Sequence, residues 1–586
     1  MIKVLPAPSS WFNRKFNKKM ELYFSENLKK IDEESRSAFG YSENILMENA
    51  GSGCYREILS LYGKSFLQKA LIIVICGKGN NGGDGFVLSR YLFNAGFNAK
   101  TAILSDKASY RGTAKENLDI LIKLGAGIIE ISKGDKIPLL EEILAEADIL
   151  VDAVFGVGLN RELNGFFKKV IETINEKSDY GRNRERLKKF ESKYQRENYD
   201  GDGYKDGETA KGFDIICIDV PSGLNADTGE FMGAGIKNNI KKVFTFGGLK
   251  TGFYINEGEK LLLSEKTVLI DINQPAQLLK KYCSGINIIT GEEIGKCLKD
   301  RKKTGTKFDY GHLLVIAGSS GKSGAAFMAS YAGFKSGAGL VTAAVPAKLN
   351  DIMEAKTDEI MTYPVFDDNN GFFIENGAEI IKKNLLKGKN ALVIGPGIGL
   401  KEETKIFLHN LLPEIKVPVI LDADALNILS ENIDFLKKIA NQTDLILTPH
   451  FKEMERLSGI DRHIIEKDPI NTGKKFAKEF GAYLMLKGSS MFIFDKNGEN
   501  VSIQGCHSPL LASGGSGDAL SGLTGGFICG GTSLYMSMKC AAFILVYSAK
   551  NLENKYGYFG AGAVKITENV PIALNLMLAE SRSGIF

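Results

Sequence analysis

The sequence predicts an α/β protein of two domains, and two observations carry this prediction. Short apolar strands alternate with helix-length segments from about residue 20 to 275, and the same pattern restarts near residue 305. Continuous apolar strands separated by helices are typical of a parallel sheet covered by helices on both faces. Between them, residues 273–304 show no comparable strand and lead into the charged segment KDRKKTGTK. We therefore place a linker there and expect domains over residues 20–275 and 290–586.

The strands expected in each domain follow from their apolar runs. The N-terminal domain, which we expect to be a Rossmann-like three-layer sandwich, has runs at 71–76, 147–156, 213–223, 242–248 and 267–272. The C-terminal domain has runs at 312–320, 339–345, 390–397, 417–424, 444–450, 482–490 and 491–495.

Composition excludes several classes of protein. The 586 residues include 74 Lys and Arg against 70 Asp and Glu, and this near balance disfavours a nucleic-acid or membrane surface as the main partner. The eight cysteines contain no CxxC pair, which argues against a zinc knuckle or a disulfide framework. No apolar run reaches the roughly 18 residues of a membrane span. The cysteines indicate a reducing compartment, and we expect a cytoplasmic location. Residues 1–19 are basic and lack a secretory apolar segment, so we interpret them as a short extension.

One segment of the N-terminal domain differs in composition from its surroundings. In residues 175–212, half of the side chains are charged and the two signs are nearly balanced. This composition is typical of a solvated insertion. Its stretch DGDGYKDGE resembles a calcium loop only superficially, because Tyr204 and Lys205 replace the third ligand and the glycine.

A glycine-dense turn follows the first strand of the N-terminal domain. GKGNNGGDG over residues 77–85 precedes a helical pattern, so backbone N–H groups and a helix N-terminus could hold a phosphate. The alternative is a turn that only reverses the chain. Two further strand ends, at 151–163 and 219–229, carry polar residues, and the carboxyl ends of parallel strands gather at one crevice. Asn81, Asp152, Asp219 and Ser222 are therefore expected to converge there and to supply oxygen ligands and a proton acceptor.

Four motifs in this order carry a family resemblance. LMENAG, GxGNNGGDG, VDAxFGxGL and IDxPSGLxADTG resemble the epimerase half of the bifunctional NAD(P)H-hydrate repair enzymes, which interconverts the R and S forms of hydrated NADH and NADPH. The resemblance implies that Asn81, Asp152 and Ser222 hold a potassium ion and that Asp219 transfers a proton. It implies that the hydrated nucleotide contacts Asp219 together with Asn80, Asn81, Gly82, Gly83, Asp84, Gly156, Val157, Gly158, Leu159, Asn160, Arg161 and Glu162.

A second glycine turn lies near the end of the chain. SGGSGDALSG over residues 513–522 places Asp518 at the start of a helix, where backbone N–H groups can stabilise a phosphoryl group while the carboxylate accepts a proton. The alternative is that Asp518 only caps its helix. Together with IGPGIG, DADALN, LTPH and LKGSS, this turn resembles the ribokinase-like, ADP-dependent dehydratase half of the same repair enzymes.

That resemblance implies the second set of site residues. Asp518 would be catalytic and would face the hydrate together with Ala325, Gly399 and His450. The adenine nucleotide would bind at Lys487, Gly488, Ser489, Ser490, Met491 and Gly517. Met491 stands where the family has a threonine, so a hydroxyl contact would be lost.

The resemblance implies a metabolite-repair function. The first domain would epimerise the hydrate, and the second would dehydrate its S form with ADP, giving AMP and phosphate, with magnesium ion neutralising the phosphates. We expect small-molecule partners only, in a homo-oligomer. Two alternatives stay open: a ribokinase-like small-molecule kinase with a regulatory Rossmann-like domain, and a non-enzymatic nucleotide-binding scaffold.

Overall fold

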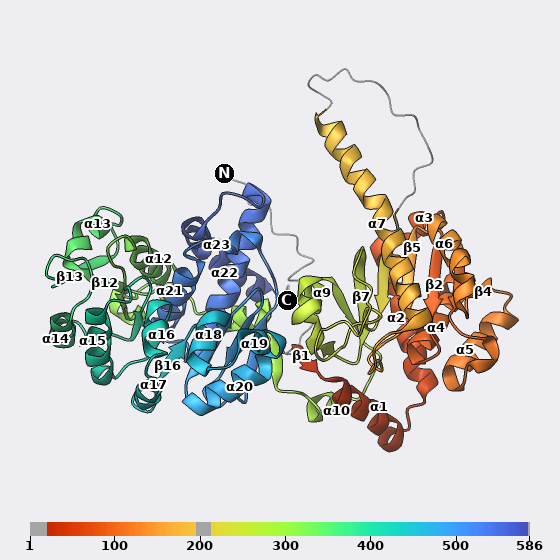
Figure 1. Cartoon of the computed structure of the whole chain (residues 1–586), viewed down its shortest axis with the longest axis horizontal. Helices are drawn as coiled ribbons and strands as arrows, with labels where there is room; N and C mark the ends of the chain where they lie inside the picture. Colours follow the sequence, from red (N-terminus) through yellow and green to blue (C-terminus); the bar gives the residue numbers. More distant parts are fainter. Residues whose placement is uncertain (1–19, 195–211, 584–586) are drawn as a thin grey trace. The chain divides into compact units, whose positions relative to one another are not determined.

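The computed structural model describes residues 20–194 and 212–583. In the helix Gly165–Tyr194, side chains are described only as far as Asp179. The chain forms two compact units, Glu21–Ser284 and Gly285–Phe586, and each is described here by itself (Figure 1). The expected N-terminal extension, and the part of the expected insertion from 195 to 211, lie outside the described residues.

The N-terminal unit is built on a parallel sheet with the strand order β4-β3-β2-β5-β6-β7-β9. The strands of this sheet are β2 (Ile72–Cys76), β3 (Ala99–Ile103), β4 (Ile128–Glu130), β5 (Ile149–Ala153), β6 (Asp214–Ile218), β7 (Ile240–Phe246) and β9 (Thr267–Ile270). The chain runs outward from β2 through β3 and β4, then crosses back to β5 on the other side. The order therefore reverses between β2 and β5, which is where α/β sheets bind ligands.

Helices pack against this sheet, and α4 contacts strands β2, β3 and β5 as well as α2 and α5. The helices are α1 (Ser25–Phe39), α2 (Glu43–Tyr62), α3 (Lys64–Leu67), α4 (Asn80–Asn94), α5 (Gly112–Lys123), α6 (Ile137–Glu146), α7 (Gly165–Tyr194), α8 (Asn256–Lys260), α9 (Leu263–Lys266) and α10 (Ala276–Lys281). Two short strands, β1 (Met20–Tyr23) and β8 (Leu249–Lys250), pair in parallel.

The start of the expected insertion needs correction. Asn175 and Ser178 are buried in α7, and the Asn175 carboxamide donates to the Gly235 carbonyl at 2.9 Å and accepts the Lys237 N–H at 3.0 Å. Ser178 is held through its own carbonyl, which accepts from the Asn239 side chain. These first residues of 175–212 therefore belong to the packed part of the unit. The polar side chains of Asn175 and Ser178 are typical of a solvated segment, but here hydrogen bonds hold both residues in the packed unit.

The C-terminal unit contains a larger mixed sheet with the order β13-β12-β11-β14-β15-β16-β17-β18-β19-β10. Its strands are β10 (Ile286–Ile288), β11 (His312–Ile316), β12 (Leu340–Pro346), β13 (Met361–Val365), β14 (Ala391–Ile394), β15 (Val419–Leu421), β16 (Leu445–Leu447), β17 (Tyr483–Lys487), β18 (Met491–Phe494) and β19 (Val501–Gln504). Only β18 runs antiparallel to its neighbours. The strand order reverses between β11 and β14, as it does between β2 and β5 in the first unit.

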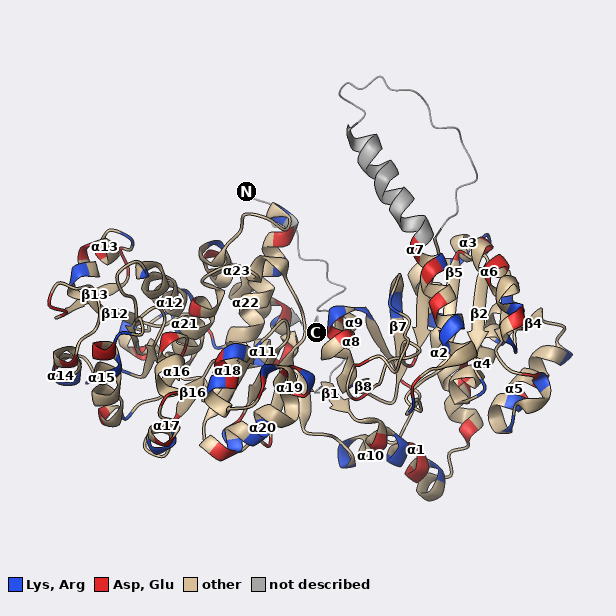
Figure 2. Cartoon of the chain, in the orientation of Figure 1, with Lys and Arg blue, Asp and Glu red and all other residues tan. Residues whose placement is uncertain are grey.

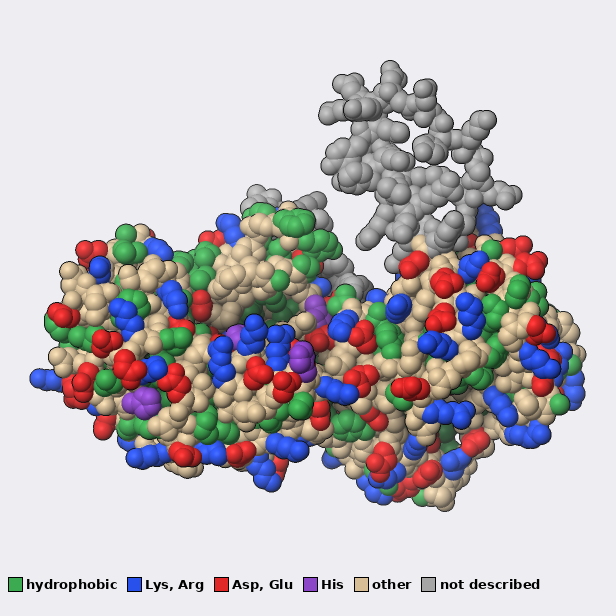
Figure 3. Space-filling model, viewed as in Figure 1, with side chains coloured by type: hydrophobic (Ala, Val, Ile, Leu, Met, Phe, Trp, Pro, Cys, Tyr) green, Lys and Arg blue, Asp and Glu red, His purple; other side chains and the backbone are tan. Residues whose placement is uncertain are grey.

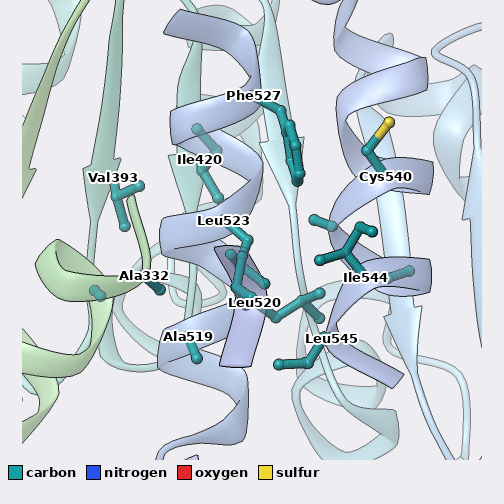
Figure 4. Close-up of a cluster of buried hydrophobic side chains, with 14 of the residues drawn as sticks. Ala332, Val393, Ile420, Ala519, Leu520, Leu523, Phe527, Cys540, Ile544 and Leu545 are labelled. Atoms are coloured by element: carbon teal, nitrogen blue, oxygen red, sulfur yellow. The ribbon is translucent and has the colours of Figure 1, made fainter. Parts of the chain in front are cut away.

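The core of the C-terminal unit lies where α21 packs between α12, α22 and the sheet (Figure 4). Figure 4 shows Leu523 and Phe527 of α21 directed toward Ile544 and Cys540 of α22. The helices are α11 (Gly291–Cys297), α12 (Ser323–Lys335), α13 (Asn350–Glu354), α14 (Glu375–Asn384), α15 (Glu402–Leu411), α16 (Asp424–Leu429), α17 (Ile433–Ala440), α18 (Phe451–Ser458), α19 (Arg462–Lys467), α20 (Pro469–Phe480), α21 (Ser516–Cys529), α22 (Leu534–Tyr556) and α23 (Ala563–Ser583).

The two-domain α/β fold with parallel sheets confirms the predicted fold class. The segment 273–304 is more ordered than a linker, because it holds α10, α11 and strand β10, which pairs with β19. Acidic and basic side chains are interspersed over the visible surface of each unit, while the strands carry few of them (Figures 2 and 3). Among the described helices, none combines the length and the apolar character that a membrane crossing requires.

Candidate active sites

The glycine turn after β2 is packed so tightly that it requires glycine. A Cβ on Gly82 would lie 1.9 Å from the Gly77 carbonyl oxygen, and one on Gly77 would lie 2.1 Å from that of Val154. The turn after β2 is thereby pressed against the end of β5, at the reversal of strand order. The first residues of α4, Asn80 and Asn81, project from this turn.

A cavity of about 780 Å³ opens at this edge of the sheet. Ten of the residues implied for the hydrated nucleotide line it: Asn80, Asn81, Asp84, Gly156, Val157, Gly158, Leu159, Asn160, Arg161 and Asp219. Gly82, Gly83 and Glu162 are not part of its lining. Gly83 instead faces Met47 and Ala114, because a Cβ there would lie 2.5 Å from the Met47 methyl group. Gly82 and Gly83 therefore shape the turn.

Asp219 is the most strongly held carboxylate of this cavity. It follows β6 with φ of 64°, a left-handed conformation that Asp and Asn adopt more readily than most residues. Its Oδ1 accepts from Nζ of Lys250 at 2.7 Å and from the Thr245 hydroxyl at 3.3 Å. Its Oδ2 accepts the Val157 N–H at 3.2 Å. A Cβ on Gly156 would lie 2.8 Å from Oδ2 and 3.4 Å from the Asn81 carboxamide, so both groups reach the same point.

Lys250 was not predicted from the sequence. It is a buried lysine that forms an ion pair with Asp219. Only 1% of its side chain is exposed, and its ammonium donates to Asp219, to the Thr245 hydroxyl at 2.6 Å and to the Phe246 carbonyl at 2.8 Å. These three acceptors match the three donors of an ammonium group. The signal in the sequence was weak, since a single lysine after an apolar strand has no distinctive pattern.

The three residues implied for potassium, Asn81, Asp152 and Ser222, are all buried. Asp152 is fully buried and accepts the Ser222 N–H at 2.8 Å and the Ser222 hydroxyl at 2.5 Å. Burial raises the pKa of the Asp152 carboxyl, and the Ser222 hydrogen bonds oppose this rise. Both polar atoms of the Asn81 carboxamide are buried and have no hydrogen-bond partner in the described part of the chain. Amide, carboxylate and hydroxyl oxygens are donor types that suit a hard cation, so these residues fit the implied ion in their chemistry.

In the C-terminal unit, the turns at the β11/β14 reversal are also glycine-rich. Gly397 and Gly399 have φ of 67° and 85°, and a Cβ on Gly397 would lie 3.0 Å from that of Ala325. The Gly399 N–H donates to Oδ2 of Asp424 at 2.9 Å, and Nζ of Lys322 lies 2.9 Å from the same oxygen. Ala325, in the first turn of α12, thus packs against Gly397, and Asp424 joins Gly399 to Lys322 just before α12. Asp424 was not predicted as a site residue from the sequence.

Asp518 lies in the first turn of α21. Burial and the charge of Asp422 raise the pKa of its carboxyl to about 7, although the Lys487 ammonium opposes this rise. Asp422 is itself buried, with its Oδ1 2.6 Å from Nζ of Lys487 and its Oδ2 accepting the Ser521 hydroxyl at 2.6 Å. A Cβ on Gly517 would lie 3.4 Å from the Lys487 ammonium. Asp518, Gly517 and Lys487 therefore share one charged centre.

The hairpin between β17 and β18 directs its residues to different sides. Gly488 and Ser489 are exposed at the turn, but Ser490 is buried, with its hydroxyl 3.4 Å from Nε2 of His507. Met491 packs into the hydrophobic cluster of the unit. The side chains of Ser490 and Met491 are both buried, so Met491, where the resemblance implies a threonine, packs in the core.

His450 has a structural role at the start of α18. Its Nδ1 accepts the Glu453 N–H at 3.1 Å, and its own N–H donates to the Glu453 carboxylate at 2.9 Å, which forms a capping box. Burial lowers the pKa of the imidazole, so the ring is neutral at pH 7. His450 also forms a backbone bridge with Lys487, which places it beside the charged centre.

These sites define a chain with two separate α/β units, each with a glycine-rich turn and a buried carboxylate at its strand reversal. Residues 43–252 match the model of the YjeF-related protein N-terminus family, and residues 313–571 match that of the NAD(P)H-hydrate dehydratase family. The bifunctional NAD(P)H-hydrate repair enzyme Nnr of Moorella thermoacetica is 32% identical over 507 residues, covering 86% of this chain and 88% of that protein. The chain belongs to the family of bifunctional NAD(P)H-hydrate repair enzymes.

A further relative is matched over both units, and a solved structure over half of the chain. The repair enzyme Nnr of Dictyoglomus turgidum is 28% identical and is matched over 95% of this chain and 98% of its own length. Among solved structures, an ADP/ATP-dependent NAD(P)H-hydrate dehydratase from Bacillus subtilis, co-crystallised with ATP and Mg²⁺, covers 50% of this chain and 98% of its own, with 22% identity and a TM-score of 0.43.

Proposed function

We propose that this chain repairs hydrated NADH and NADPH: the N-terminal unit interconverts the R and S epimers, and the C-terminal unit dehydrates the S epimer at the expense of ADP. The observation that carries the proposal is family membership across both units, since the relative from Moorella thermoacetica is matched over 88% of its length. The two charged centres, at Asp219 and at Asp518, give each activity its own residues.

In the dehydratase, Asp518 is the proton acceptor. It takes the proton of the C6 hydroxyl as that oxygen attacks the terminal phosphoryl group of ADP, and AMP leaves. Phosphate then departs with the help of the ring-nitrogen lone pair, and loss of a proton from C5 restores the double bond. A carboxyl pKa of about 7 suits this role, because a base works best when its pKa lies near the working pH.

The neighbours of Asp518 position the phosphates. The Lys487 ammonium, oriented by Asp422, and the N-terminus of α21 both favour negative charge next to Asp518. Asp422 and Asp424 are each paired with a lysine. Because both carboxylates already have a lysine partner, we expect magnesium to arrive bound to the nucleotide, whose phosphate oxygens it would neutralise.

In the epimerase, Asp219 is the proton-transfer residue at the hydrate, and the cavity lining binds the nucleotide. Asn81, Asp152 and Ser222 would hold a potassium ion, which would supply fixed positive charge beside the glycine turn. The eight cysteines all lie in the described part of the chain and are free thiols, which supports a reducing, cytoplasmic setting.

A single assay tests the function. The full chain is given mixed hydrate epimers with ADP, with ATP or with neither, and the absorbance of the reduced nicotinamide is followed while AMP is measured by chromatography. We expect complete recovery of NADH with one AMP formed per turnover when ADP is supplied. A stable phosphorylated product would instead identify a small-molecule kinase, and binding without turnover would identify a scaffold.

A further inference from the structure

A second carboxyl group lines the N-terminal cavity together with Asp219. Asp32 of α1 lines the same 780 Å³ cavity as Asp219 and Lys250. It is half-buried, and its Oδ1 accepts from the Gln274 carboxamide at 2.5 Å. The family resemblance assigned it no role, because it precedes all four motifs of the first domain.

The two carboxyl groups have opposite surroundings. Asp219 receives hydrogen bonds from Lys250, Thr245 and the Val157 N–H. Burial, together with the charge of Asp219, raises the pKa of Asp32 to about 6. Gln274, Lys250 and Arg36 oppose this rise. One carboxylate held by three donors, next to a second carboxyl group whose pKa is raised, is an arrangement suited to one base and one acid.

We propose that Asp32 is the second proton-transfer residue of the epimerase, acting as the acid while Asp219 acts as the base. The proposal rests on the function proposed above. Asp219 takes the proton of the C6 hydroxyl, and the freed electron pair forms a C6=O double bond. The C6–N1 bond breaks, its electron pair stays on N1, and N1 takes the proton of Asp32.

The ring then closes by the reverse steps. Rotation about the C5–C6 single bond turns the other face of the aldehyde toward N1. N1 attacks C6 and returns its proton to Asp32, while the oxygen recovers its proton from Asp219. Both residues end in their starting states, and the only change is the configuration at C6.

Two neighbouring groups are less suited to this role. The Lys250 ammonium already donates to three oxygens, so it holds Asp219 in place. Asp84 also lines the cavity, but burial and the charges of Asp219 and Asp32 hold its pKa well above the usual range. No hydrogen-bond donor supports the Asp84 carboxylate within the described residues. Asp32 has such a donor in Gln274, so it can both give a proton and take it back.

The test uses the full chain and purified R epimer without ADP, so that the dehydratase is silent, and chromatography separates R from S. After subtraction of the spontaneous rate, Asp32→Asn should lower kcat for epimerisation by about 100-fold or more. Glu34→Gln is the matched control on the same helix, where Glu34 pairs with Lys281 at the surface, and it should be normal. An Asp32→Asn variant as active as the parent would overturn the proposal.

The pH profile separates a catalytic role from a structural one. Because protonated Asp32 is the acid, the parent rate should fall above about pH 6. Gln274→Leu removes the donor that lowers the Asp32 pKa, so this falling limb should move to higher pH. An unmoved limb would contradict the proposal even if Asp32→Asn does not fold. If the parent itself does not interconvert the epimers, the proposed function fails, which is a different result.

Discussion

The Lys250 ammonium lies 2.7 Å from Oδ1 of Asp219, and both side chains are buried at the carboxyl edge of the N-terminal sheet. This ion pair fixes the carboxylate at the point where the turns after β2 and β5 meet. A charge buried in this way depends on its partner, because neither group can recover its solvation in water.

Lys250→Met should therefore be strongly destabilising. The variant leaves Asp219 without its counter-charge, at a cost of about 3–5 kcal/mol to the N-terminal unit, and epimerisation should be lost. Lys241→Met is the control, since Lys241 lies 3.8 Å from Asp214 and both are partly exposed, and it should cost less than about 1 kcal/mol. Denaturant unfolding measures both. Similar losses in the two variants would show that the buried pair has no special weight.

Gly82 and Gly79 should differ sharply when replaced by alanine. A Cβ on Gly82 would lie 1.9 Å from the Gly77 carbonyl oxygen, whereas one on Gly79 meets nothing within 4 Å. Gly82→Ala should therefore distort the turn and abolish nucleotide binding in the N-terminal cavity, while Gly79→Ala should change stability by no more than about 1 kcal/mol. Thermal unfolding and epimerase rates provide the readout. Normal epimerisation by Gly82→Ala would mean that the turn is not part of the site.

Asp518→Asn should abolish ADP-dependent dehydration and leave epimerisation intact. The change removes the proton acceptor but keeps the size of the side chain. In the parent, burial raises the pKa of Asp518 to about 7, so the ionised base is lost as the pH falls through 7. Dehydration should accordingly rise with pH and level off above this value, when it is measured with saturating ADP. A flat profile, or near-normal dehydration by the variant, would remove Asp518 from the mechanism.

Most strands could be predicted from the sequence because they are continuous apolar runs, as in β2 and β11. Among the strands of the two sheets, β3, β4, β10, β13 and β19 were not expected. Of these, β10 and β19 are short and pair with each other across a long separation in sequence. The order of the glycine motifs also indicated which turns would meet, and the structure brings Asn81, Gly156 and Asp219 together.

The supporting residues of the N-terminal site could not be predicted. Asp32, Lys250 and Gln274 come from three separate segments and follow no local pattern, so only folding brings them to one cavity. The burial of Met491 could not be predicted either, because it depends on which face of β18 packs against the core. Such residues are specified by packing across the domain and follow no local pattern, whereas the glycine turns are visible in the sequence as dense glycine motifs.

The central claim, that one chain holds two separate catalytic centres acting in sequence, is tested most directly by Asp219→Asn. Asparagine suits this variant because it tolerates the φ of 64° and keeps an acceptor for Lys250. Given mixed epimers and ADP, the variant should repair the S portion at the parental rate and then slow to the spontaneous conversion of R to S, while the parent continues to completion. Repair of both epimers at the parental rate would contradict the role of Asp219, and repair of neither would contradict the division into two sites.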